Sequence, residues 1–404
     1  MECKLRPLSQ ITKEIINTEN YPTKTSSEQI DVEKQVLKKL EDLHNTKLKV
    51  NKELPELLKD KHRNFLFDSL TYVSSAYEVL DASRPWLCYW ILHPLSLMGI
   101  QLDYRRKKVI AKFLKKCQSR TGGFGGGPGQ IAHLATTYAA VNALVILGIE
   151  EALNVINRKK LQEFLWRVRQ VDGSFQMHEN GEVDIRGAYC ALSIASLTGI
   201  MTPELFRNTA EWIVSCQTYE GGFAGCPGME AHGGYAFCGL AALVILNKGH
   251  LIDERALLRW LVQKQMKVEG GFQGRTNKLV DACYSFWQGG AFPLLYSLLY
   301  VADNPPKQHL FDSGSLQEYL LACCQNPNGG LIDKPGRSRD LYHTCYAISG
   351  LSIAQHFMDT TPILGPKRNE VQCTHPLYNI RPDFVRKALL YFNELGLPEE
   401  DMQT

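Results

Sequence analysis

The stretch QTYEGGF at residues 217–223 decides the fold, because four further versions of it recur along the 404 residues of the chain. These versions lie at residues 118–124, 170–175, 265–272 and 325–331, and each joins a glutamine to a glycine-bearing turn and a large apolar residue. The phenylalanines at 124, 175, 223 and 272 recur every 48 to 51 residues, a period that suits one pair of helices per repeat. Such helix pairs cannot bury their apolar faces alone, so they must stack into one body.

The segments on the two sides of each turn differ in character. An amphipathic stretch precedes the glutamine, and the stretch that follows the turn is apolar on nearly all sides, as at 139–144 and 236–242. That contrast predicts an outer ring of amphipathic helices around an inner ring of buried helices. We therefore predict an all-α fold without strands, an α/α barrel (toroid) of about six helix pairs, with an open solenoid as the alternative. Residues 85–90 are expected to open the inner ring and residues 383–395 to close it.

The composition changes near residue 60, which suggests the domain organisation. Residues 1–60 are charged and are expected to form a tail with a possible helix at 32–48, while residues 61–404 are expected to form the barrel. Two segments, 303–315 and 359–382, interrupt the repeat and contain prolines. We expect both insertions to be surface loops.

Bulk composition argues against several classes of function. The net charge of +3 is too small to indicate binding to nucleic acid or to a membrane surface. The chain shows no apolar leader and no run of about 18 apolar residues that could span a membrane. Its 12 cysteines include no CxxC pair and fall mostly in apolar stretches, as is typical of a reduced protein. We therefore expect a cytoplasmic protein without membrane insertion.

Every repeat places a different side chain three residues before an aligned tyrosine. The tyrosines are Tyr138, Tyr189, Tyr235, Tyr284 and Tyr346, and the side chains before them are Ala135, Arg186, His232, Asp281 and His343. If the repeats form a closed ring, these side chains meet around one central hollow.

The segment Asp281-Ala282-Cys283 is the sharpest local signal. At a helix start Asp281 can occupy a cap position while Cys283 lies in the first turn, and the next repeat has His343 at the position of Asp281. A carboxylate, a thiolate and an imidazole could bind zinc and leave its fourth position open, as in a reactive site. The alternative is that Asp281 only caps a helix, Cys283 fills the core and His343 is an ordinary interior histidine.

Cationic side chains lie next to these candidate ligands. Arg275 and Lys278 precede Asp281, and His232 begins the neighbouring inner helix. Together with the phenol of Tyr284 they would suit a diphosphate, whose contacts with cations are charge-assisted. The alternative is that Arg275 and Lys278 are rim charges in a glycine-rich loop.

Aromatic side chains are concentrated at the inner-helix positions. They are Trp86, Tyr89, Trp90, Tyr189, Tyr235, Phe237, Trp287 and Tyr342. Aromatic residues at such positions often form the core, but so many around one barrel could also line an apolar funnel for a long hydrocarbon.

Taken together, the five repeats, DACYSFWQ at 281–288 and DLYHTCY at 340–346 resemble the β subunits of protein farnesyltransferases, within the protein prenyltransferase family. The resemblance covers roughly residues 65–395. It implies a zinc-dependent α/α-barrel enzyme that works as a heterodimer with a helical α subunit. It also implies transfer of farnesyl from farnesyl diphosphate to the cysteine of a C-terminal CaaX tail, as found on proteins such as small GTPases.

The same resemblance implies roles for individual residues. The zinc ligands would be Asp281, Cys283 and His343, and Tyr284 would also take part in catalysis. The diphosphate would contact His232, Arg275, Lys278, Tyr284 and Arg337, of which Arg337 departs from the lysine that is common in the family. The isoprenoid and peptide pocket would be lined by Trp86, Trp90, Arg186, Tyr189, Tyr235, Trp287 and Tyr342, with Arg186 facing the peptide carboxylate. Asp333 would help Mg²⁺ to meet the diphosphate.

Related enzymes are the alternatives to this assignment. The resemblance implies that β subunits of geranylgeranyltransferase type I carry smaller residues at the position of Trp86 and a lysine at that of Asp333, so this chain favours the farnesyl enzyme. A terpene cyclase would need D-x-D-D or D-D-x-x-D, and neither motif occurs. A complement-like thioester domain would need GCGEQ, whereas Cys226 lies in GCPG.

Overall fold

The computed structural model describes residues 3–16, 22–49, 53–73, 75–299, 310–358 and 361–398. Over these ranges the regular secondary structure is almost wholly helical. The α-helices are α1 (Leu8–Ile11), α2 (Lys24–Lys49), α3 (Lys59–Thr71), α4 (Arg84–Leu97), α5 (Tyr104–Cys117), α6 (Leu134–Leu147), α7 (Glu150–Leu153), α8 (Arg158–Val168), α9 (Ile185–Leu197), α10 (Thr209–Ser215), α11 (Gly233–Ile245), α12 (Glu254–Val262), α13 (Tyr284–Trp287), α14 (Ala291–Leu299), α15 (Ser313–Glu318), α16 (Leu341–His356) and α17 (Pro382–Glu394). The other elements are η1 (Thr12–Glu14), η2 (Ser75–Ser83), η3 (Gly249–Leu251), η4 (Tyr319–Cys323), η5 (Lys367–Asn369), β1 (Leu331–Ile332) and β2 (Arg339–Asp340).

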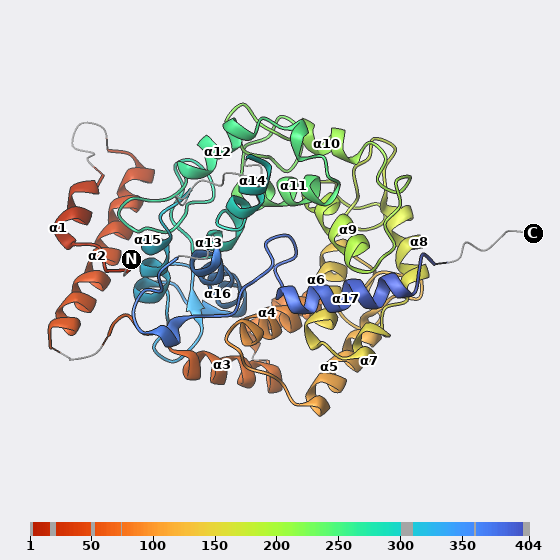
Figure 1. The fold of residues 1–404 in the computed structure, drawn as a ribbon, viewed down its shortest axis with the longest axis horizontal. Coiled ribbons are helices and arrows are strands. Elements are labelled where there is room, and N and C mark those ends of the chain that lie inside the picture. The colour runs from red at the N-terminus through yellow and green to blue at the C-terminus, as the bar shows by residue number, and fades with distance from the viewer. Residues whose placement is uncertain are drawn as a thin grey trace, which may run out of the picture.

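Two concentric layers of helices form a closed toroid (Figure 1). The inner helices α4, α6, α9, α11, α13 and α16 contact one another in chain order, and α16 packs back against α4. The outer helices that precede them are α3, α5, α8, α10, α12 and α15. The predicted α/α barrel is therefore confirmed, and an open solenoid is excluded because the first and last inner helices touch.

The inner helices are buried along most of their length. Every residue of α6 is buried except Ala135, and every residue of α9 is buried except Arg186 and Ser196. Ala135 and Arg186 are two of the residues that stand three places before the aligned tyrosines. Outer helix α5, in contrast, buries one stripe at Ile110, Ala111, Leu114 and Cys117, the spacing of an amphipathic helix.

The first glycine of each turn lies under the start of the next outer helix. Gly122 has φ +89°, and a Cβ there would lie 1.8 Å from the carbonyl oxygen of Lys160 in α8. Gly329, in the fifth repeat, has φ +88°, and a Cβ there would lie 2.1 Å from the carbonyl oxygen of Lys61 in α3. Only glycine tolerates both the conformation and the close approach. The same contact thus joins successive repeats and closes the ring.

The repeated glutamine explains how each repeat fixes the next one. The side chain of Gln217 donates to Asp253 O and accepts from Asp253 N, both at 3.0 Å, which ties it to the cap of α12. In the last repeat Gln325 accepts from Leu58 N at 2.8 Å and so holds the start of α3. Since α3 is the first outer helix, this bond again closes the ring.

The second repeat departs from the alignment that its sequence suggests. Arg169, not Gln170, forms the bridge with Phe175 that Gln118 forms with Phe124 in the first repeat. Arg169 then donates to the carbonyl oxygens of Leu205 at 2.9 Å and Arg207 at 2.8 Å. The guanidinium of Arg169 therefore takes the place of the glutamine amide in this repeat. Arg169 stands four residues before Gly173, as Gln118 stands four residues before Gly122, and this spacing sets the register of the turn.

The segment 361–381 is not a surface loop, so that expectation was wrong. It enters the ring ahead of α17, where Figure 1 shows the blue chain reaching toward the centre. Tyr89 donates to Asn379 O at 2.7 Å, and Tyr138 and Asn142 donate to Tyr378 O at 3.3 and 3.2 Å. Buried carbonyl groups need such donors, and the inner helices supply them. Helix α17 then packs on α6 and α9 instead of closing the inner ring.

Two further differences concern smaller elements. The expectation of no strands was wrong at one place, where β1 and β2 form a two-stranded antiparallel ladder beside α16. Of the other insertion, residues 303–309 lie outside the described residues, and Ser313 already begins α15. None of the described helices combines the length and the apolar composition that crossing a bilayer requires.

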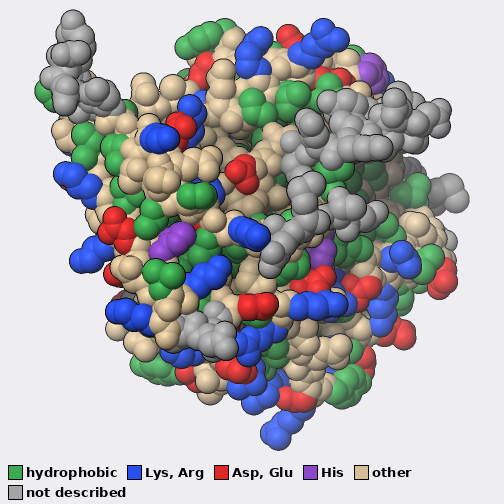
Figure 2. Space-filling model, turned by 60° about the vertical axis from the view of Figure 1, so that its left-hand side comes forward, with side chains coloured by type: hydrophobic (Ala, Val, Ile, Leu, Met, Phe, Trp, Pro, Cys, Tyr) green, Lys and Arg blue, Asp and Glu red, His purple; other side chains and the backbone are tan. Residues whose placement is uncertain are grey.

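The N-terminal helices α1 and α2 lie outside the ring, beside α15 (Figure 1). Arg6 forms an ion pair with Glu318 at 2.5 Å, and Gln29 donates to Glu33 at 3.0 Å and to Glu269 at 2.8 Å. These contacts fasten the charged N-terminal region to the fourth and fifth repeats. Figure 2, which brings this side forward, shows basic and acidic side chains interspersed over the visible face.

Candidate metal and diphosphate-binding site

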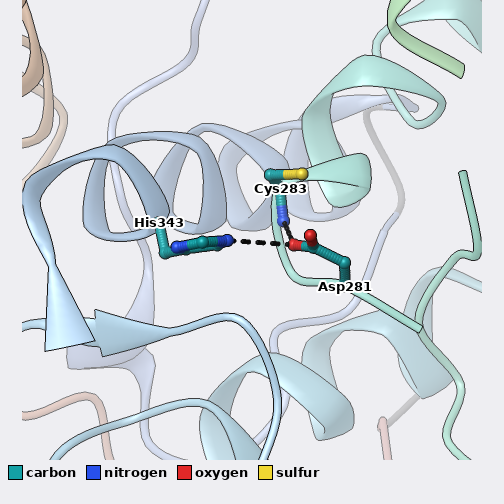
Figure 3. A group of neighbouring side chains, drawn as sticks. All are labelled: Asp281, Cys283 and His343. Atoms are coloured by element: carbon teal, nitrogen blue, oxygen red, sulfur yellow. Dashed lines mark hydrogen bonds and ion pairs between the residues drawn. The ribbon is translucent and has the colours of Figure 1, made fainter. Parts of the chain in front are cut away.

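Asp281, Cys283 and His343 converge, as the repeat alignment predicts (Figure 3). Asp281 and Cys283 lie just before α13, where Cys283 is the N-cap, and His343 lies in the first turn of α16. One possible ligand atom from each residue lies within 4.8 Å of the others. Helices α13 and α16 are neighbours in the inner ring, so the fold itself brings the three side chains together.

Local hydrogen bonds fix these side chains. Asp281 Oδ1 accepts from Cys283 N at 2.8 Å. Cys283, not Asp281, is the N-cap of α13, so Asp281 lies two residues before the cap and the expected cap position was wrong. Asp340, the N-cap of α16, accepts from the backbone N of His343 at 2.7 Å and contacts its Nδ1 at 2.6 Å. The other ring nitrogen, Nε2, then lies 3.3 Å from Asp281 Oδ1.

Burial and charge set the protonation of the three groups. Burial alone would lower the pKa of His343, but hydrogen bonds to Asp281 and Asp340 raise it to about 10. Burial also opposes ionisation of Asp281, yet its bond to His343 holds the pKa of the carboxyl below its usual range. Burial, followed by the charge of Asp281, raises the pKa of the Cys283 thiol well above its usual value. The metal-free cluster is thus an imidazolium, a carboxylate and a neutral thiol.

The donor set fits zinc. Sulfur, imidazole nitrogen and carboxylate oxygen are the zinc ligands of proteins, and three protein ligands leave one position for a substrate. The Asp340 contact to Nδ1 is the outer hydrogen bond that a metal-binding histidine usually makes. Among the described residues, this is the group of His, Cys, Asp and Glu side chains that could hold a metal ion.

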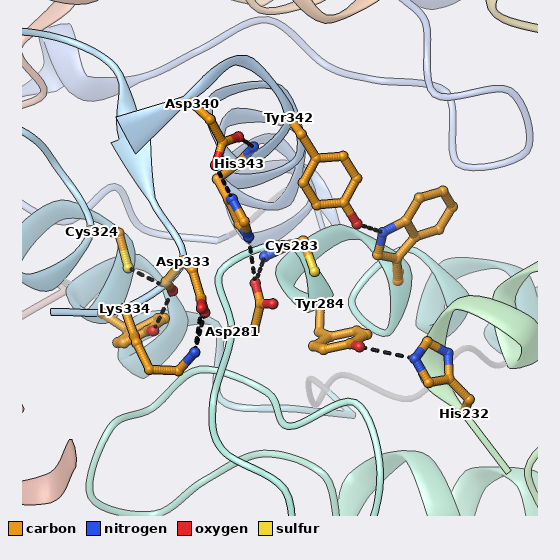
Figure 4. A network of polar contacts seen from close by, with 12 residues as sticks. His232, Asp281, Cys283, Tyr284, Cys324, Asp333, Lys334, Asp340, Tyr342 and His343 are labelled. Atoms are coloured by element: carbon orange, nitrogen blue, oxygen red, sulfur yellow. Dashed lines mark hydrogen bonds and ion pairs between the residues drawn. The ribbon is translucent and has the colours of Figure 1, made fainter. Parts of the chain in front are cut away.

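A second polar group lies beside the first (Figure 4). Tyr284 and His232 are hydrogen-bonded through the phenol oxygen and Nε2 at 3.0 Å. Burial, then the charge of Arg275, lowers the pKa of His232 to about 4, so its imidazole is neutral near pH 7. Arg275 itself is paired with Glu230 at 3.0 Å. Neutral donors and a nearby guanidinium are an arrangement that can stabilise an anion.

The other predicted charges lie farther out. Lys278 and Arg337 are exposed in loops, where solvent surrounds their side chains. Asp333 holds the ammonium group of Lys334 with both carboxylate oxygens. The backbone carbonyl of Asp333 accepts from Ala282 N at 2.9 Å, which places this residue beside the metal cluster. Burial, then the charge of Asp281, raises the pKa of Asp333.

A belt of aromatic rings runs around the inside of the toroid. Successive ring centroids lie 4.5 to 5.7 Å apart in the order Trp86, Tyr138, Tyr189, Phe237, Trp287, Tyr346, Tyr342, Trp90 and back to Trp86. Trp86, Trp90, Trp287 and Tyr342 keep partial solvent exposure although they belong to inner helices. These four side chains therefore face the hollow of the ring.

The remaining predicted pocket residues are distributed differently. Tyr235 is partly exposed and packs on His232 with a centroid distance of 4.9 Å. Arg186 is exposed and is held by Asp184, with Nε and Nη2 at 2.9 and 2.6 Å from its oxygens. Tyr189 is only 2% exposed and donates to Leu377 O at 2.7 Å. Tyr189 thus anchors the segment 361–381 and offers little surface to a ligand.

The sequence reasoning missed four polar residues of this site. Asp340 could have been found, because it precedes His343 by three residues at a helix start. Lys334, Glu230 and Lys264 gave no such signal, since their contacts come from other loops. Lys264 is 3% exposed and donates to Thr276 Oγ1 at 2.8 Å, beneath the loop that carries Arg275.

Comparisons with known proteins agree with this architecture. The family model described as the prenyltransferase alpha-alpha toroid domain matches residues 57–380. The protein farnesyltransferase subunit beta of Pisum sativum is 43% identical over 376 residues, which cover 77% of this chain and 90% of the relative. The geranylgeranyl transferase type-1 subunit beta of Arabidopsis thaliana is 30% identical over 333 residues, covering 74% of this chain and 85% of the relative.

A solved structure shows the same fold. Candida albicans protein geranylgeranyltransferase-I complexed with GGPP superposes with a TM-score of 0.70 at 24% identity. The match covers 83% of this chain and 100% of that chain. At this identity the likeness supports the toroid.

Proposed function

The chain belongs to the protein farnesyltransferase β subunits, and from that premise we propose that it transfers farnesyl from farnesyl diphosphate to the cysteine thiol of C-terminal CaaX tails, with an α subunit as its partner. Membership supports the reaction class, because the farnesyltransferase relative is more similar to this chain than the geranylgeranyl transferase type-1 relative, at 43% against 30% identity. The residues that carry the reaction are argued from the site.

The observation that carries the proposal is the convergence of a three-ligand cluster and an anion-stabilising group. Asp281, Cys283 and His343 offer sulfur, nitrogen and oxygen within 4.8 Å. Tyr284, the residue after Cys283, has its phenol oxygen 3.0 Å from Nε2 of His232. A thiol acceptor and a diphosphate donor could therefore lie side by side at the mouth of the aromatic belt.

Zinc held by Asp281, Cys283 and His343 would supply deprotonation of the substrate thiol near neutral pH, because coordination favours the thiolate. Asp340 fixes the His343 ring so that Nε2 faces the cluster. No general base is needed from this chain, and none of its neutral side chains has to accept the thiol proton.

The leaving group would be stabilised by the polar side chains opposite this cluster. The phenol of Tyr284, the imidazole of His232 and the guanidinium of Arg275 can donate to the oxygens of a diphosphate as negative charge builds there. Lys278 and Arg337 extend from adjacent loops and add positive charge. Asp333 would hold Mg²⁺, since carboxylate oxygens are its preferred ligands, after release of Lys334.

The aromatic belt would receive the isoprenoid. Trp86 packs on Trp90 at 5.5 Å and on Tyr138 at 5.7 Å, so it presents bulk where a longer chain would need room. Trp86 and Asp333 favour farnesyl over geranylgeranyl diphosphate as the donor. Arg186, which Asp184 holds at the rim, would face the peptide carboxylate.

The proposal is tested by a transfer assay on the chain co-expressed with its α subunit. Purified heterodimer is expected to contain one zinc per β subunit and to prenylate a CaaX peptide, with farnesyl diphosphate preferred over geranylgeranyl diphosphate. A peptide whose cysteine is replaced by serine is the matched control. A zinc-free heterodimer with full transfer activity would refute the site, and exclusive use of geranylgeranyl diphosphate would refute the donor.

A further inference from the structure

Glu230 and Arg275 form an ion pair across two neighbouring loops of the site. Glu230 Oε2 lies 3.0 Å from Arg275 Nη1, and the two side chains are 50% and 39% exposed. Glu230 stands two residues before His232, the N-cap of α11, and Arg275 stands in the loop before Asp281. A half-exposed pair of this kind is weak, so another anion can displace the carboxylate.

Arg275 also acts on the groups that would hold a diphosphate. Its charge is the second cause, after burial, of the lowered pKa of His232, and it opposes the rise in the pKa of Tyr284 that burial causes. The guanidinium therefore lies within electrostatic reach of both residues. An arginine has five N–H donors, and the structure commits one of its nitrogens to Glu230.

The loop beneath Arg275 is fixed, in contrast to its side chain. The buried ammonium of Lys264 donates to Thr276 Oγ1 at 2.8 Å and lies 4.9 Å from the centre of the Trp260 ring. Gln288 Nε2 donates to Gln273 O at 2.6 Å on the other side of the loop. A change of partner at this place is therefore confined to the Arg275 side chain.

We propose that Glu230 is a positioning residue that competes with the diphosphate for Arg275. The Glu230 carboxylate holds the guanidinium in the empty site, releases it when a diphosphate binds, and takes it back when inorganic diphosphate leaves. This inference rests on the proposed function, since it assumes that Arg275 contacts the diphosphate. Glu230 would then set the affinity of the site for farnesyl diphosphate and for the inorganic diphosphate that is released.

The chain offers a matched control in Glu220. Its two oxygens accept from Ala231 N at 3.3 Å and from Thr276 Oγ1 at 3.4 Å, so it bridges the same two loops. Among the described residues, the ion pair of Arg275 is with Glu230 and not with Glu220. Removing the charge of Glu220 therefore changes the local potential without releasing the guanidinium.

The test is a binding measurement on the heterodimer with inorganic diphosphate and with farnesyl diphosphate, by titration calorimetry. Glu230→Gln is expected to bind both about threefold more tightly, in keeping with the strength of an exposed ion pair, and Glu220→Gln to change affinity less. Arg275→Gln should bind more weakly. In the Arg275→Gln background, Glu230→Gln should have no further effect, because Glu230 acts through Arg275.

Three outcomes overturn the inference while the proposed function stands. They are unchanged or weaker binding by Glu230→Gln, equal tightening by Glu220→Gln, and a Glu230→Gln effect that persists in the Arg275→Gln background, which would mean direct repulsion of the diphosphate. Zinc content and thermal unfolding of each variant verify that it is folded. If the wild-type heterodimer bound neither ligand, the proposed function itself would fail, and this inference with it.

Discussion

Asp340 Oδ2 lies 2.6 Å from Nδ1 of His343, and this contact determines which ring nitrogen faces the cluster. The other oxygen of Asp340 accepts from the His343 backbone at 2.7 Å, so one carboxylate fixes both the main chain and the ring. Only Nε2 is then directed at Asp281. A ligand oriented in this way before the metal arrives needs little rearrangement to bind it.

The first prediction concerns zinc. Cys283→Ala and His343→Ala should each give a folded heterodimer with greatly reduced zinc and at least ~10-fold lower transfer activity, because each removes one of three protein ligands. Metal analysis and a transfer assay measure the two effects. Cys345→Ala is the control, since Cys345 is a buried cysteine of α16 outside the cluster. Full zinc content in both ligand variants would refute the assignment.

The second prediction concerns magnesium. Activity should rise with Mg²⁺, because a hard cation can take the carboxylate of Asp333 from Lys334 and offset the charge of the diphosphate. Asp333→Lys should largely remove this dependence while it keeps part of the rate, since an ammonium would replace part of the charge. Asp333→Asn is the matched variant. It should lose the dependence on Mg²⁺ and also the part of the rate that Asp333→Lys keeps. Rates measured from chelator to millimolar Mg²⁺ decide the matter, and a flat wild-type profile contradicts the prediction.

Glu269 provides a prediction about pH and stability. It is buried, at 1% exposed, and it receives the Gln29 bond that fastens α2 to the ring. Burial is the main cause that raises its pKa from 4.5 to about 7, and the Glu33 carboxylate adds to the rise while Gln29 and Arg6 oppose it. Below pH 4.5 the carboxyl is protonated in both the folded and the unfolded chain and favours neither.

Between pH 4.5 and about 7 the unfolded chain loses this proton while the folded chain keeps it, so the folded state loses stability as pH rises. The loss is on the order of 3 kcal/mol. Glu269→Gln should remove this part of the pH dependence, whereas Glu41→Gln, an exposed substitution on α2, should keep it. Denaturant midpoints at pH 5 and pH 8 measure the difference. Parallel profiles for the wild type and Glu269→Gln would contradict the prediction.

The ring and the metal cluster could be predicted because both follow from the repeat. Most repeats hold the next outer helix through the same glutamine, as Gln217 does at the cap of α12, so the recurring phrase encodes these contacts. Aligning Asp281 with His343 placed them on neighbouring inner helices. The alignment worked because the aligned tyrosines Tyr284 and Tyr346 mark equivalent positions even where the insertion at 303–315 lengthens the repeat.

The parts that could not be predicted depend on single long-range contacts. The segment 361–381 contains prolines and polar residues like a surface loop, but Tyr138 donates to Tyr378 O across 240 positions of sequence. Tyr189, which was expected to line the pocket, donates to Leu377 O, a contact that its place in the repeat does not reveal. The pairing of Glu230 with Arg275 likewise joins two loops that have no common pattern. Contacts between segments outside the repeat leave no periodic pattern in the sequence, so they could not be predicted from it.

The last prediction concerns the length of the donor. Trp86 is partly exposed toward the hollow and packs on Trp90 and Tyr138, so Trp86→Thr should open room for five more carbons while leaving a void under farnesyl. Burying additional methylene groups contributes about 0.8 kcal/mol each, so preference should move toward geranylgeranyl diphosphate by roughly tenfold or more. Asp281, Cys283 and His343 are untouched by this change, so zinc binding should survive.

The two diphosphates are compared in one competition assay, with Trp166→Thr as the control. Trp166 is a 44% exposed tryptophan on outer helix α8, and its replacement should leave the product ratio unchanged. If Trp86 were an ordinary core residue, its variant would lose stability and use both donors less well in equal proportion. An unchanged product ratio in a folded, zinc-loaded Trp86→Thr heterodimer therefore rules out a role for Trp86 in selecting the chain length.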